Sequence, residues 1–254
     1  MGEYIDVFKR TEIKYLLSEE QYIELLSFLK GIARVDEYGE TRINNIYFDT
    51  PDYRLIRTSL EKPIYKEKLR LRTYGTTEDG TSAFIEIKKK YDGVVYKRRI
   101  GGTYRNAFDY LVNEGEPIDD SQISKEIEGM INMYEDLSPS MKICYDRVAM
   151  VGINNPELRI TFDKDIEWSN DDMDLRSGKT GNPILKNGQR LMEIKVANSM
   201  PMEIATKLSE LSIFPSSFSK YGRGYVDMIS RYINTSTVVK ENNEPYGKEV
   251  IAYA

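Results

Sequence analysis

Apolar and polar residues alternate along much of the chain, which is the pattern of strands with one buried face. Alternating segments bounded by Gly, Pro, Asn and Asp predict eight strands. They cover residues 4–17, 42–48, 65–74, 82–91, 94–101, 141–152, 157–168 and 190–197. Asp92 and Gly93 between the fourth and fifth segments are typical of a tight hairpin, so we expect mostly antiparallel neighbours.

A period of three to four residues predicts helices between these strands. Ser18 and Gln21 have the spacing of a capping box and begin a helix that runs to about Leu29. The other predicted helices cover residues 104–112, 121–137, 202–211 and 221–233. The polar segment 171–188 predicts a mobile loop. No break in composition and no repeat divides the chain, so we expect one domain over 1–254, with a core at about 4–233 and a loosely ordered tail at 234–254.

Five predicted strands have an apolar face and a face of charged or polar residues. The polar faces hold Glu12 and Lys14; Lys68, Arg70 and Arg72; Glu86 and Lys88; Arg159, Thr161 and Asp163; Glu193 and Lys195. An open antiparallel sheet with its charged side in water explains any one such strand. All five together favour a closed sheet, with amphipathic helices on the apolar side. The predicted fold is therefore α+β, an eight-stranded antiparallel β-barrel whose charged side lines a tunnel.

A tunnel lined by many like charges needs a polyanion to neutralise it. Arg and Lys suit phosphate oxygens because they present several donors and stay charged. Glutamates among them indicate a hard cation, Mg²⁺ or Mn²⁺, that bridges carboxylate and phosphate oxygens. The charge pattern thus predicts a metal-bound oligophosphate as ligand.

Composition narrows the chemistry further. The chain has no histidine, which excludes Ser-His-Asp and Cys-His nucleophile systems and imidazole-bound metals. Its net charge of −5 makes non-specific binding to nucleic acid or anionic membranes unexpected unless the basic residues are segregated. They are segregated, because residues 62–99 hold 11 Lys or Arg against 5 Asp or Glu, whereas residues 113–140 hold 1 against 8. The basic segment lies on the strands of the predicted tunnel, so we expect ATP, triphosphate or polyphosphate as partner and no nucleic acid. A single cysteine, Cys144, and the lack of a signal or membrane-spanning pattern lead us to expect a cytoplasmic protein.

An ordered set of motifs carries a family resemblance. It comprises Glu-Ile-Lys-Tyr (12–15), Lys-Leu-Arg-Leu-Arg-Thr-Tyr-Gly (68–75), Phe-Ile-Glu-Ile-Lys-Lys-Lys (84–90), Lys-Arg-Arg (97–99), Tyr-Asp-Arg-Val-Ala (145–149), Leu-Arg-Ile-Thr-Phe-Asp (158–163), Leu-Met-Glu-Ile-Lys (191–195) and Phe-Ser-Lys-Tyr (218–221). From residue 8 to about 230 this set resembles the VTC domain of the triphosphate tunnel metalloenzymes, the catalytic module of a eukaryotic polyphosphate polymerase. The related CYTH branch, with thiamine triphosphatases and class IV adenylate cyclases, opens with Glu-x-Glu-x-Lys. Here Arg10 replaces the first Glu, which favours the VTC branch.

The resemblance implies roles for individual residues. The residues implied in catalysis on phosphate are Arg70, Arg72, Lys88, Arg147, Arg159 and Lys195. Those implied in further phosphate contacts are Lys14, Lys68, Arg99, Tyr145, Ser219 and Lys220. Lys97 shares a strand face with Arg99, and Arg99 is the favoured choice. Glu193 is the implied principal ligand of Mn²⁺ or Mg²⁺, together with Glu12 and Glu86.

The function implied by the resemblance is phosphoryl transfer from ATP to a growing polyphosphate. The acceptor's terminal oxygen is already anionic, so no histidine base is required. Two alternatives stay open: hydrolysis of inorganic or nucleoside triphosphate, and non-catalytic binding of polyphosphate. Eukaryotic relatives act with membrane and inositol-phosphate-binding partner domains. We expect neither within this chain, and the identity of any membrane-associated partner protein stays open.

Overall fold

The computed structural model describes residues 11–178, 181–197 and 199–243, with the backbone alone for 235–243. The strands are β1 (Thr11–Leu17), β2 (Ala33–Asp49), β3 (Tyr65–Tyr74), β4 (Ser82–Tyr91), β5 (Val94–Thr103), β6 (Ser138–Gly152), β7 (Arg159–Ser169), β8 (Asn182–Pro183) and β9 (Arg190–Val196). The helices are α1 (Glu19–Leu29), α2 (Arg54–Leu60), α3 (Tyr104–Val112), α4 (Gln122–Met133), the 3₁₀ turn η1 (Leu175–Ser177), α5 (Met202–Glu210) and α6 (Lys220–Asn243).

One antiparallel sheet has the strand order β1-β9-β7-β6-β2-β3-β4-β5, and the short β8 pairs with β7. The predicted α+β class with eight main antiparallel strands is confirmed, and helices α1, α3, α4 and α5 lie on the outer side of the sheet as predicted. In the described part of the chain, however, no backbone hydrogen bonds join β1 to β5, so the sheet is not closed by its ladders. Its curvature still brings its two ends together, because Lys88 of β4 lies within electrostatic reach of Glu12 of β1 and Lys195 of β9.

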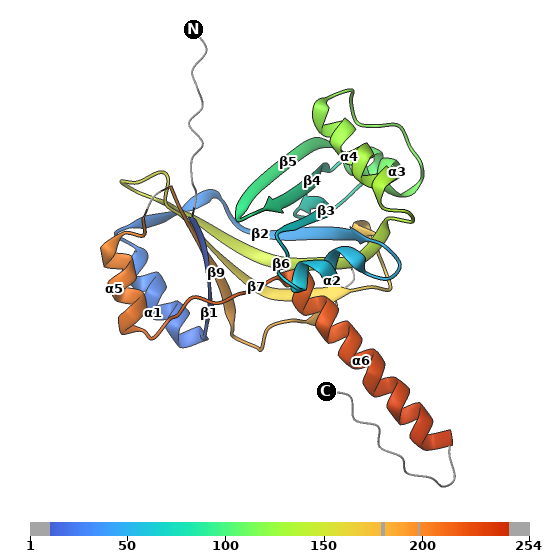
Figure 1. Cartoon of the computed structure of the whole chain (residues 1–254). Helices are drawn as coiled ribbons and strands as arrows, with labels where there is room; N and C mark the ends of the chain where they lie inside the picture. Colours follow the sequence, from blue (N-terminus) through green and yellow to red (C-terminus); the bar gives the residue numbers. More distant parts are fainter. Residues whose placement is uncertain (1–10, 179–180, 198, 244–254) are drawn as a thin grey trace.

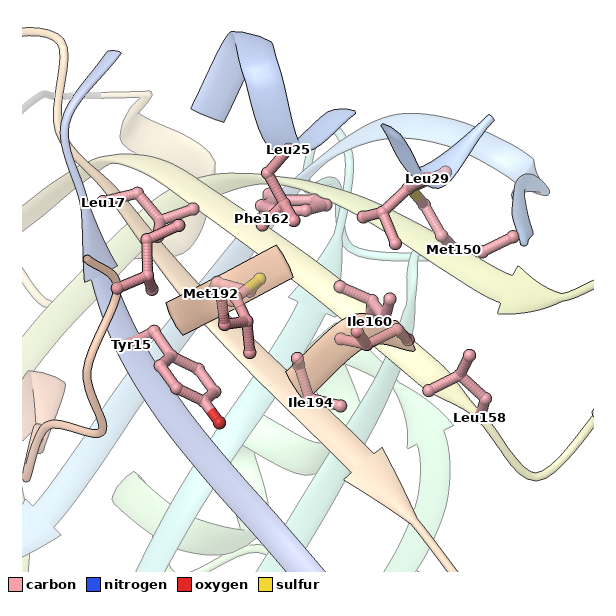
Figure 2. Packing of buried hydrophobic residues seen from close by; sticks show 14 of the residues in the cluster. Tyr15, Leu17, Leu25, Leu29, Met150, Leu158, Ile160, Phe162, Met192 and Ile194 are labelled. Carbon is pink, nitrogen blue, oxygen red and sulfur yellow. The ribbon is translucent and has the colours of Figure 1, made fainter. Parts of the chain in front are cut away.

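The apolar face of the sheet is covered by helices in two places. Helices α1 and α5 cover the β1, β9 and β7 end, and α3 and α4 cover the β3–β5 end (Figure 1). Figure 2 shows the first cluster, in which Leu25 and Leu29 of α1 pack onto Phe162, Met192 and strand neighbours. The Ser18 capping box predicted from the sequence begins α1, since Ser18 Oγ accepts from Gln21 N and Gln21 Oε1 accepts from Ser18 N. The covered apolar face leaves the charged face on the inside of the curve.

Helix α6 packs against part of this inner face. Tyr221 and Met228 of α6 join Met141, Ile143 and Trp168 in a third apolar cluster. A Cβ atom at Gly224 would lie 2.6 Å from Met141 Sδ, so the helix lies as close to the strand as glycine permits. The N-terminus of α6 therefore begins inside the curve of the sheet. Among the described residues, no helix is both long and apolar enough to cross a lipid bilayer.

The structure corrects several predicted boundaries. Strand β2 begins at Ala33, ahead of the predicted start at Arg42, and its pairing with β6 is irregular between Val35 and Glu40. Helix α2 was not predicted, and the segment predicted as a loop contains η1 and β8. Helix α6 runs from Lys220 to Asn243 and so continues past its predicted end at Ile233. Residues 4–10 of the predicted first strand and residues 244–254 lie outside the described part.

Candidate functional site

The inner face of the sheet gathers charged side chains from seven of its strands. We call this surface the charged basin. It is formed by Glu12, Lys14, Lys68, Arg70, Arg72, Glu86, Lys88, Lys97, Arg99, Arg147, Arg159, Asp163, Glu193 and Lys195 from the strands, with Lys220 from the start of α6. The strand side chains of the basin share a face because strand positions two apart point to the same side, and in β1, β3, β4, β7 and β9 the intervening residues pack in the apolar clusters. The local alternation thus fixes the membership of the basin.

One cluster in the basin is centred on Glu86 of β4, which is only 2% exposed. Arg70 Nε donates to Glu86 Oε2 at 2.6 Å, and Lys97 Nζ lies 2.9 Å from Glu86 Oε1. Arg72 Nε is farther from the same carboxylate, at 3.9 Å. Burial by itself would raise the pKa of Glu86, but Arg70 and Arg72, followed by Lys97, lower it to about 2. Glu86 therefore stays ionised and holds Arg70 in place.

A second cluster joins β7, β9, β6 and α6. Arg147 binds Asp163 with two hydrogen bonds, Nε to Oδ1 at 2.6 Å and Nη2 to Oδ2 at 2.8 Å. Lys220 Nζ lies 2.6 Å from Asp163 Oδ2 and 3.5 Å from Glu193 Oε1. Lys14 and Lys195 contact Glu193 at 3.5 and 3.9 Å. Burial acts to raise the pKa values of both carboxyl groups, but these cations outweigh it and lower both.

The start of α6 is tied to strands β1 and β3. Ser219 Oγ accepts from the backbone N–H of Gly222 at 3.1 Å, as an N-cap does, and also from Lys68 Nζ at 3.3 Å. Lys14 Nζ donates to the carbonyl of Phe218 at 3.0 Å. Ser219 therefore caps α6 and also contacts Lys68 of the charged basin. The N-terminus of a helix favours anions, so α6 adds its dipole to the positive field of the basin.

Two tyrosines position the arginines of β3. Arg70 Nη1 donates to Tyr47 Oη at 3.1 Å, and Arg72 Nη2 donates to Tyr145 Oη at 3.2 Å. Arg72 Nε also donates to Asn45 Oδ1 at 2.8 Å. The ring of Tyr47 stacks on Tyr221 of α6, with centroids 4.7 Å apart. Burial acts to raise the pKa of Tyr47, but Arg70, Arg72 and Lys68 lower it to about 8. Tyr47 was not among the predicted site residues.

Positive charge dominates the basin. Of the residues that form it, eleven are cationic and four are carboxylates, in a chain whose net charge is −5. Within the cross-strand row of Lys68, Lys88 and Lys97, only Lys97 has a carboxylate within ion-pair distance among the described residues. Like charges directly opposite each other destabilise a sheet. Such a row is typical of a surface that binds an anion with several negative charges.

Comparisons with known proteins identify the family of the chain. The model of the VTC domain family matches residues 9–229. The chain belongs to the VTC domain family. No curated protein matches the sequence. Among solved structures, a protein from Bacillus halodurans provisionally named an adenylate cyclase is similar, with a TM-score of 0.50 and 15% identity over 82% of this chain and 92% of that one. A protein from Hippeastrum, provisionally named an adenylyl cyclase and described as having dominant triphosphatase activity, has a TM-score of 0.47 and 16% identity over 85% of this chain and 95% of that one.

The predicted site residues of this VTC domain differ in how deeply they lie. Arg72, Glu86 and Glu193 are buried, whereas Glu12, Lys88, Arg99 and Arg159 reach solvent at the open part of the basin. Lys97 and Arg99 face the same side, as expected, but only Lys97 contacts a carboxylate. The guanidinium of Arg99 lies instead over the ring of Phe84, 4.9 Å from its centroid. Asp163 lies on one of the predicted charged strand faces but was not among the predicted site residues, although it binds both Arg147 and Lys220.

The carboxylates do not form a ready-made cage for a metal ion. Among the described residues, no group of three or more Asp, Glu or Cys side chains converges on one point. Glu86 is held tightly by Arg70 and Lys97 and does not fit as a ligand. Glu193 fits better, because it is buried and its lysine contacts are long, from 3.5 to 3.9 Å. Mg²⁺ is commonly bound in this way, by one or two carboxylates together with the phosphates of a substrate.

Proposed function

We propose that this VTC domain is a phosphotransferase that moves the γ-phosphoryl group of ATP onto the end of a polyphosphate chain bound in the charged basin. The observation that carries the proposal is the excess of Arg and Lys on the inner face, which surrounds the start of α6. Oligophosphate presents negative oxygens at short, regular intervals, which is the charge pattern that these residues complement.

The reaction makes little demand on acid–base chemistry. A terminal oxyanion of the acceptor chain forms a bond to the γ-phosphorus, the bond from that phosphorus to the β,γ-bridging oxygen breaks, and ADP leaves with the electron pair. No proton has to be removed from the acceptor, which is consistent with a chain that has no histidine. Catalysis then consists of aligning the two phosphate groups and neutralising charge on the transferred group.

The held arginines are suited to this task. Arg70 is fixed by Glu86 and Tyr47, and Arg72 by Asn45 and Tyr145, so both guanidinium groups are oriented before a ligand enters. Electrostatic stabilisation is most effective when the donors need no reorganisation during the reaction. Beside Arg72, Lys220 and Arg147 share the carboxylate of Asp163, and both cations lie over the ring of Tyr145.

We further propose that Glu193 holds Mn²⁺ or Mg²⁺ when the nucleotide is bound. The ion would neutralise charge on the phosphate oxygens, which is the usual contribution of a divalent cation to phosphoryl transfer. Lys14 and Lys195 would then contact phosphate oxygens in place of Glu193. The cation and the lysines would share the role of compensating the charge of the ligand.

The test is incubation of the protein with ATP and Mn²⁺ or Mg²⁺, with polyphosphate measured by gel and free phosphate by colorimetry. Polyphosphate that accumulates in the wild type and is lost in Arg72→Ala supports the proposal. Arg105→Ala serves as control, because Arg105 is an exposed arginine on α3, which covers the outer face. Free phosphate without polymer identifies a triphosphatase instead. Tight triphosphate binding without ATP consumption identifies a binding module.

A further inference from the structure

The β4–β5 hairpin ends in an unusual surface that the basin does not use. We call it the tip surface. It also includes the first residues of the neighbouring strand β3 and the segment just before that strand. Its apolar members are 43–70% exposed and are Ile64, Tyr65, Tyr91, Val94, Val95 and Tyr96. Its basic members are Lys62, Lys66, Lys89 and Lys90. So many exposed apolar side chains in one place are uncommon on a soluble domain and mark an interaction site.

Strand register brings these residues together. Tyr65 lies opposite Tyr91, and Tyr91 lies opposite Val94 across the turn. In the next rows Lys66 faces Lys90, and Lys89 faces Tyr96. The backbone N–H of Asp92 donates to the carbonyl of Ile64 at 3.0 Å, which holds the segment before β3 against the turn. Aromatic rings and lysines therefore alternate within a small area.

The helices that cover the outer face of the sheet end before this surface. Near the end of α4, Tyr134 Oη donates to Glu67 Oε1 at 2.7 Å, and Glu126 of α4 lies 4.0 Å from Arg98. Leu69 and Ile87, which pair with each other farther from the turn, are fully packed in the apolar cluster beneath α3 and α4. Tyr65 and Tyr91, which pair four positions closer to the turn, are exposed.

The lysines of the tip surface lack acidic partners. Among the described residues, none of Lys62, Lys66, Lys89 and Lys90 lies within ion-pair distance of a carboxylate. Glu67 lies opposite Lys89 in the register, but it is buried and accepts from Tyr134. Lys66 Nζ donates only to the carbonyl of Ser59, at 3.2 Å. Desolvation is the main cause that lowers the pKa of Lys66, and the nearby charges of Lys90, Lys62 and Lys88 lower it further. Because these lysines repel one another, an anionic partner that binds here would be stabilised by their charge.

We propose that the tip surface docks the protein onto an anionic lipid bilayer. Tyrosine rings lie well at a membrane interface, with the ring among the acyl chains and the hydroxyl in the head-group layer. Lysines nearby are attracted to anionic lipid head groups and keep their ammonium groups in water. Val94 and Val95 on the two faces of the hairpin, together with Ile64, would add apolar area to the inserted part.

The shape of the tip surface favours a lipid partner over a protein. Val95, Lys66 and Lys90 lie on the inner face of the ribbon, and Tyr65, Tyr91, Val94 and Tyr96 lie on its outer face. A fluid bilayer can contact both faces at once, whereas a folded partner needs a groove that surrounds the ribbon. A second copy of this chain would bring lysines against lysines. If the tip surface contacts the bilayer, the cross-strand row of Lys68, Lys88 and Lys97 lies next to the membrane, because it is two positions farther from the turn than Lys66 and Lys90.

The experiment is co-sedimentation of the full chain with vesicles of phosphatidylcholine alone and of equal parts phosphatidylcholine and phosphatidylserine. We expect binding to the phosphatidylserine vesicles only, and weaker binding as salt screens the lysines. Lys89→Gln/Lys90→Gln should weaken binding about thirtyfold, at about 1 kcal/mol for each lysine. Tyr91→Ser/Val94→Ser/Tyr96→Ser should weaken it by more than about tenfold. The matched control is Ile23→Ser/Phe214→Ser, because these residues are 60% and 69% exposed elsewhere and should leave binding unchanged.

A second measurement guards against loss of binding through misfolding. Tyr91→Trp adds an interfacial reporter to a chain whose single native Trp168 is buried. Its emission should shift to shorter wavelength with phosphatidylserine vesicles and be quenched by brominated lipid. Vesicle binding that survives both tip variants, equal binding to neutral vesicles, no binding at all, or a dimer that depends on Tyr91 and Tyr96 without lipid would each overturn the proposal. The last outcome would assign the tip surface to self-association.

Discussion

The ammonium nitrogen of Lys220 lies 2.6 Å from Oδ2 of Asp163, and this pair ties the first residue of α6 to strand β7. Arg147 occupies the other side of the same carboxylate, which is fully buried. The ring of Tyr145 lies 4.5 Å from the Lys220 ammonium and closes the cluster. A single carboxylate thus holds two cations that the proposed function requires.

Asp163→Asn should therefore have opposite effects on folding and on binding. Loss of the buried carboxylate removes the ion-pair partner of Arg147 and the nearer of the two partners of Lys220, and should lower the free energy of unfolding by about 3 kcal/mol. The same two cations should then bind triphosphate more tightly, so triphosphate should raise the melting temperature more than in the wild type. Urea titration and thermal melts measure both effects. Asp109→Asn, at an exposed pair with Arg105, is the control and should change neither.

Tyr47 should give the protein a distinctive dependence on pH. Its pKa is about 8 in the folded state, below its usual value of 10.0, because of Arg70, Arg72 and Lys68. Between these values the unfolded chain keeps the phenolic proton that the folded chain has lost, so stability rises with pH across this window and is lost as pH falls through 8. The difference in unfolding free energy between wild type and Tyr47→Phe should grow by up to about 2 kcal/mol from pH 8 to pH 10.

Tyrosinate absorbance gives an independent check on Tyr47. Part of the absorbance change in the wild type should occur near pH 8, and Tyr47→Phe should lose that part. Tyr104→Phe is the matched control, because burial first of all raises the pKa of Tyr104 beyond the usual range. An identical titration for wild type and Tyr47→Phe would show that Arg70 and Arg72 do not favour the phenolate.

Glu193→Gln should separate metal binding from phosphate binding. The substitution keeps the shape of the side chain and removes one negative charge, so metal-free triphosphate affinity should stay the same or rise. Turnover of ATP should fall by orders of magnitude if a divalent cation bound there supplies several kcal/mol of charge stabilisation. Arg72→Ala should instead weaken triphosphate binding as well as turnover. Calorimetry and ATP consumption measure the two variants, and full activity of Glu193→Gln would remove Glu193 as the metal ligand.

Triphosphate should stabilise the folded protein against heat. A ligand that binds only the folded state at about a hundred times its Kd adds about 2.7 kcal/mol to the free energy of unfolding. Monophosphate should raise the melting temperature much less, because it reaches fewer of the basic side chains. Thermal shift with each anion, with and without Mn²⁺, is the measurement. An unchanged melting temperature with triphosphate would contradict any phosphate-binding role for the basin.

Lys97 and Arg99 should differ in their effect on binding. Lys97 shares Glu86 with Arg70, whereas Arg99 lies over Phe84 and is exposed. Lys97→Ala should therefore lower triphosphate affinity more than Arg99→Ala does. Isothermal calorimetry compares the two variants directly. A larger loss in Arg99→Ala would restore the choice that the sequence favoured.

The sequence by itself determined most of the strands and the charge of their faces. Alternation has a period of two residues, so the grouping of Lys68, Arg70 and Arg72, and that of Glu193 with Lys195, follows from local geometry. The capping box at Ser18 is local in the same sense. The family could be inferred as well, because its motifs are short segments in a fixed order.

Helix α2 shows where local reasoning ends. Its first N–H group, of Arg54, donates to Thr50 Oγ1 at 2.9 Å. The next two are satisfied by Asp49, whose carboxylate accepts from Leu55 at 2.8 Å and Ile56 at 3.0 Å and from Tyr221 of α6 at 2.8 Å. Asp49 lies at the end of β2, several residues before the helix, so no capping motif is visible in the sequence. The helix forms because a strand and a distant helix hold its cap in place.

Only the tertiary structure decided which charges meet. The curvature of the sheet brings Lys88 toward Glu12 and Lys195. This curvature is the sum of the twists of many strands, so the sequence of no single strand predicts it. The contact of Lys220 with Asp163 joins positions far apart in the chain and depends on how closely α6 packs at Gly224. Tyr47 gives no sign in the sequence of being a site residue, because its neighbours Arg70 and Tyr221 come from other elements. Alternation selects the face of a side chain, and long-range packing selects its partner.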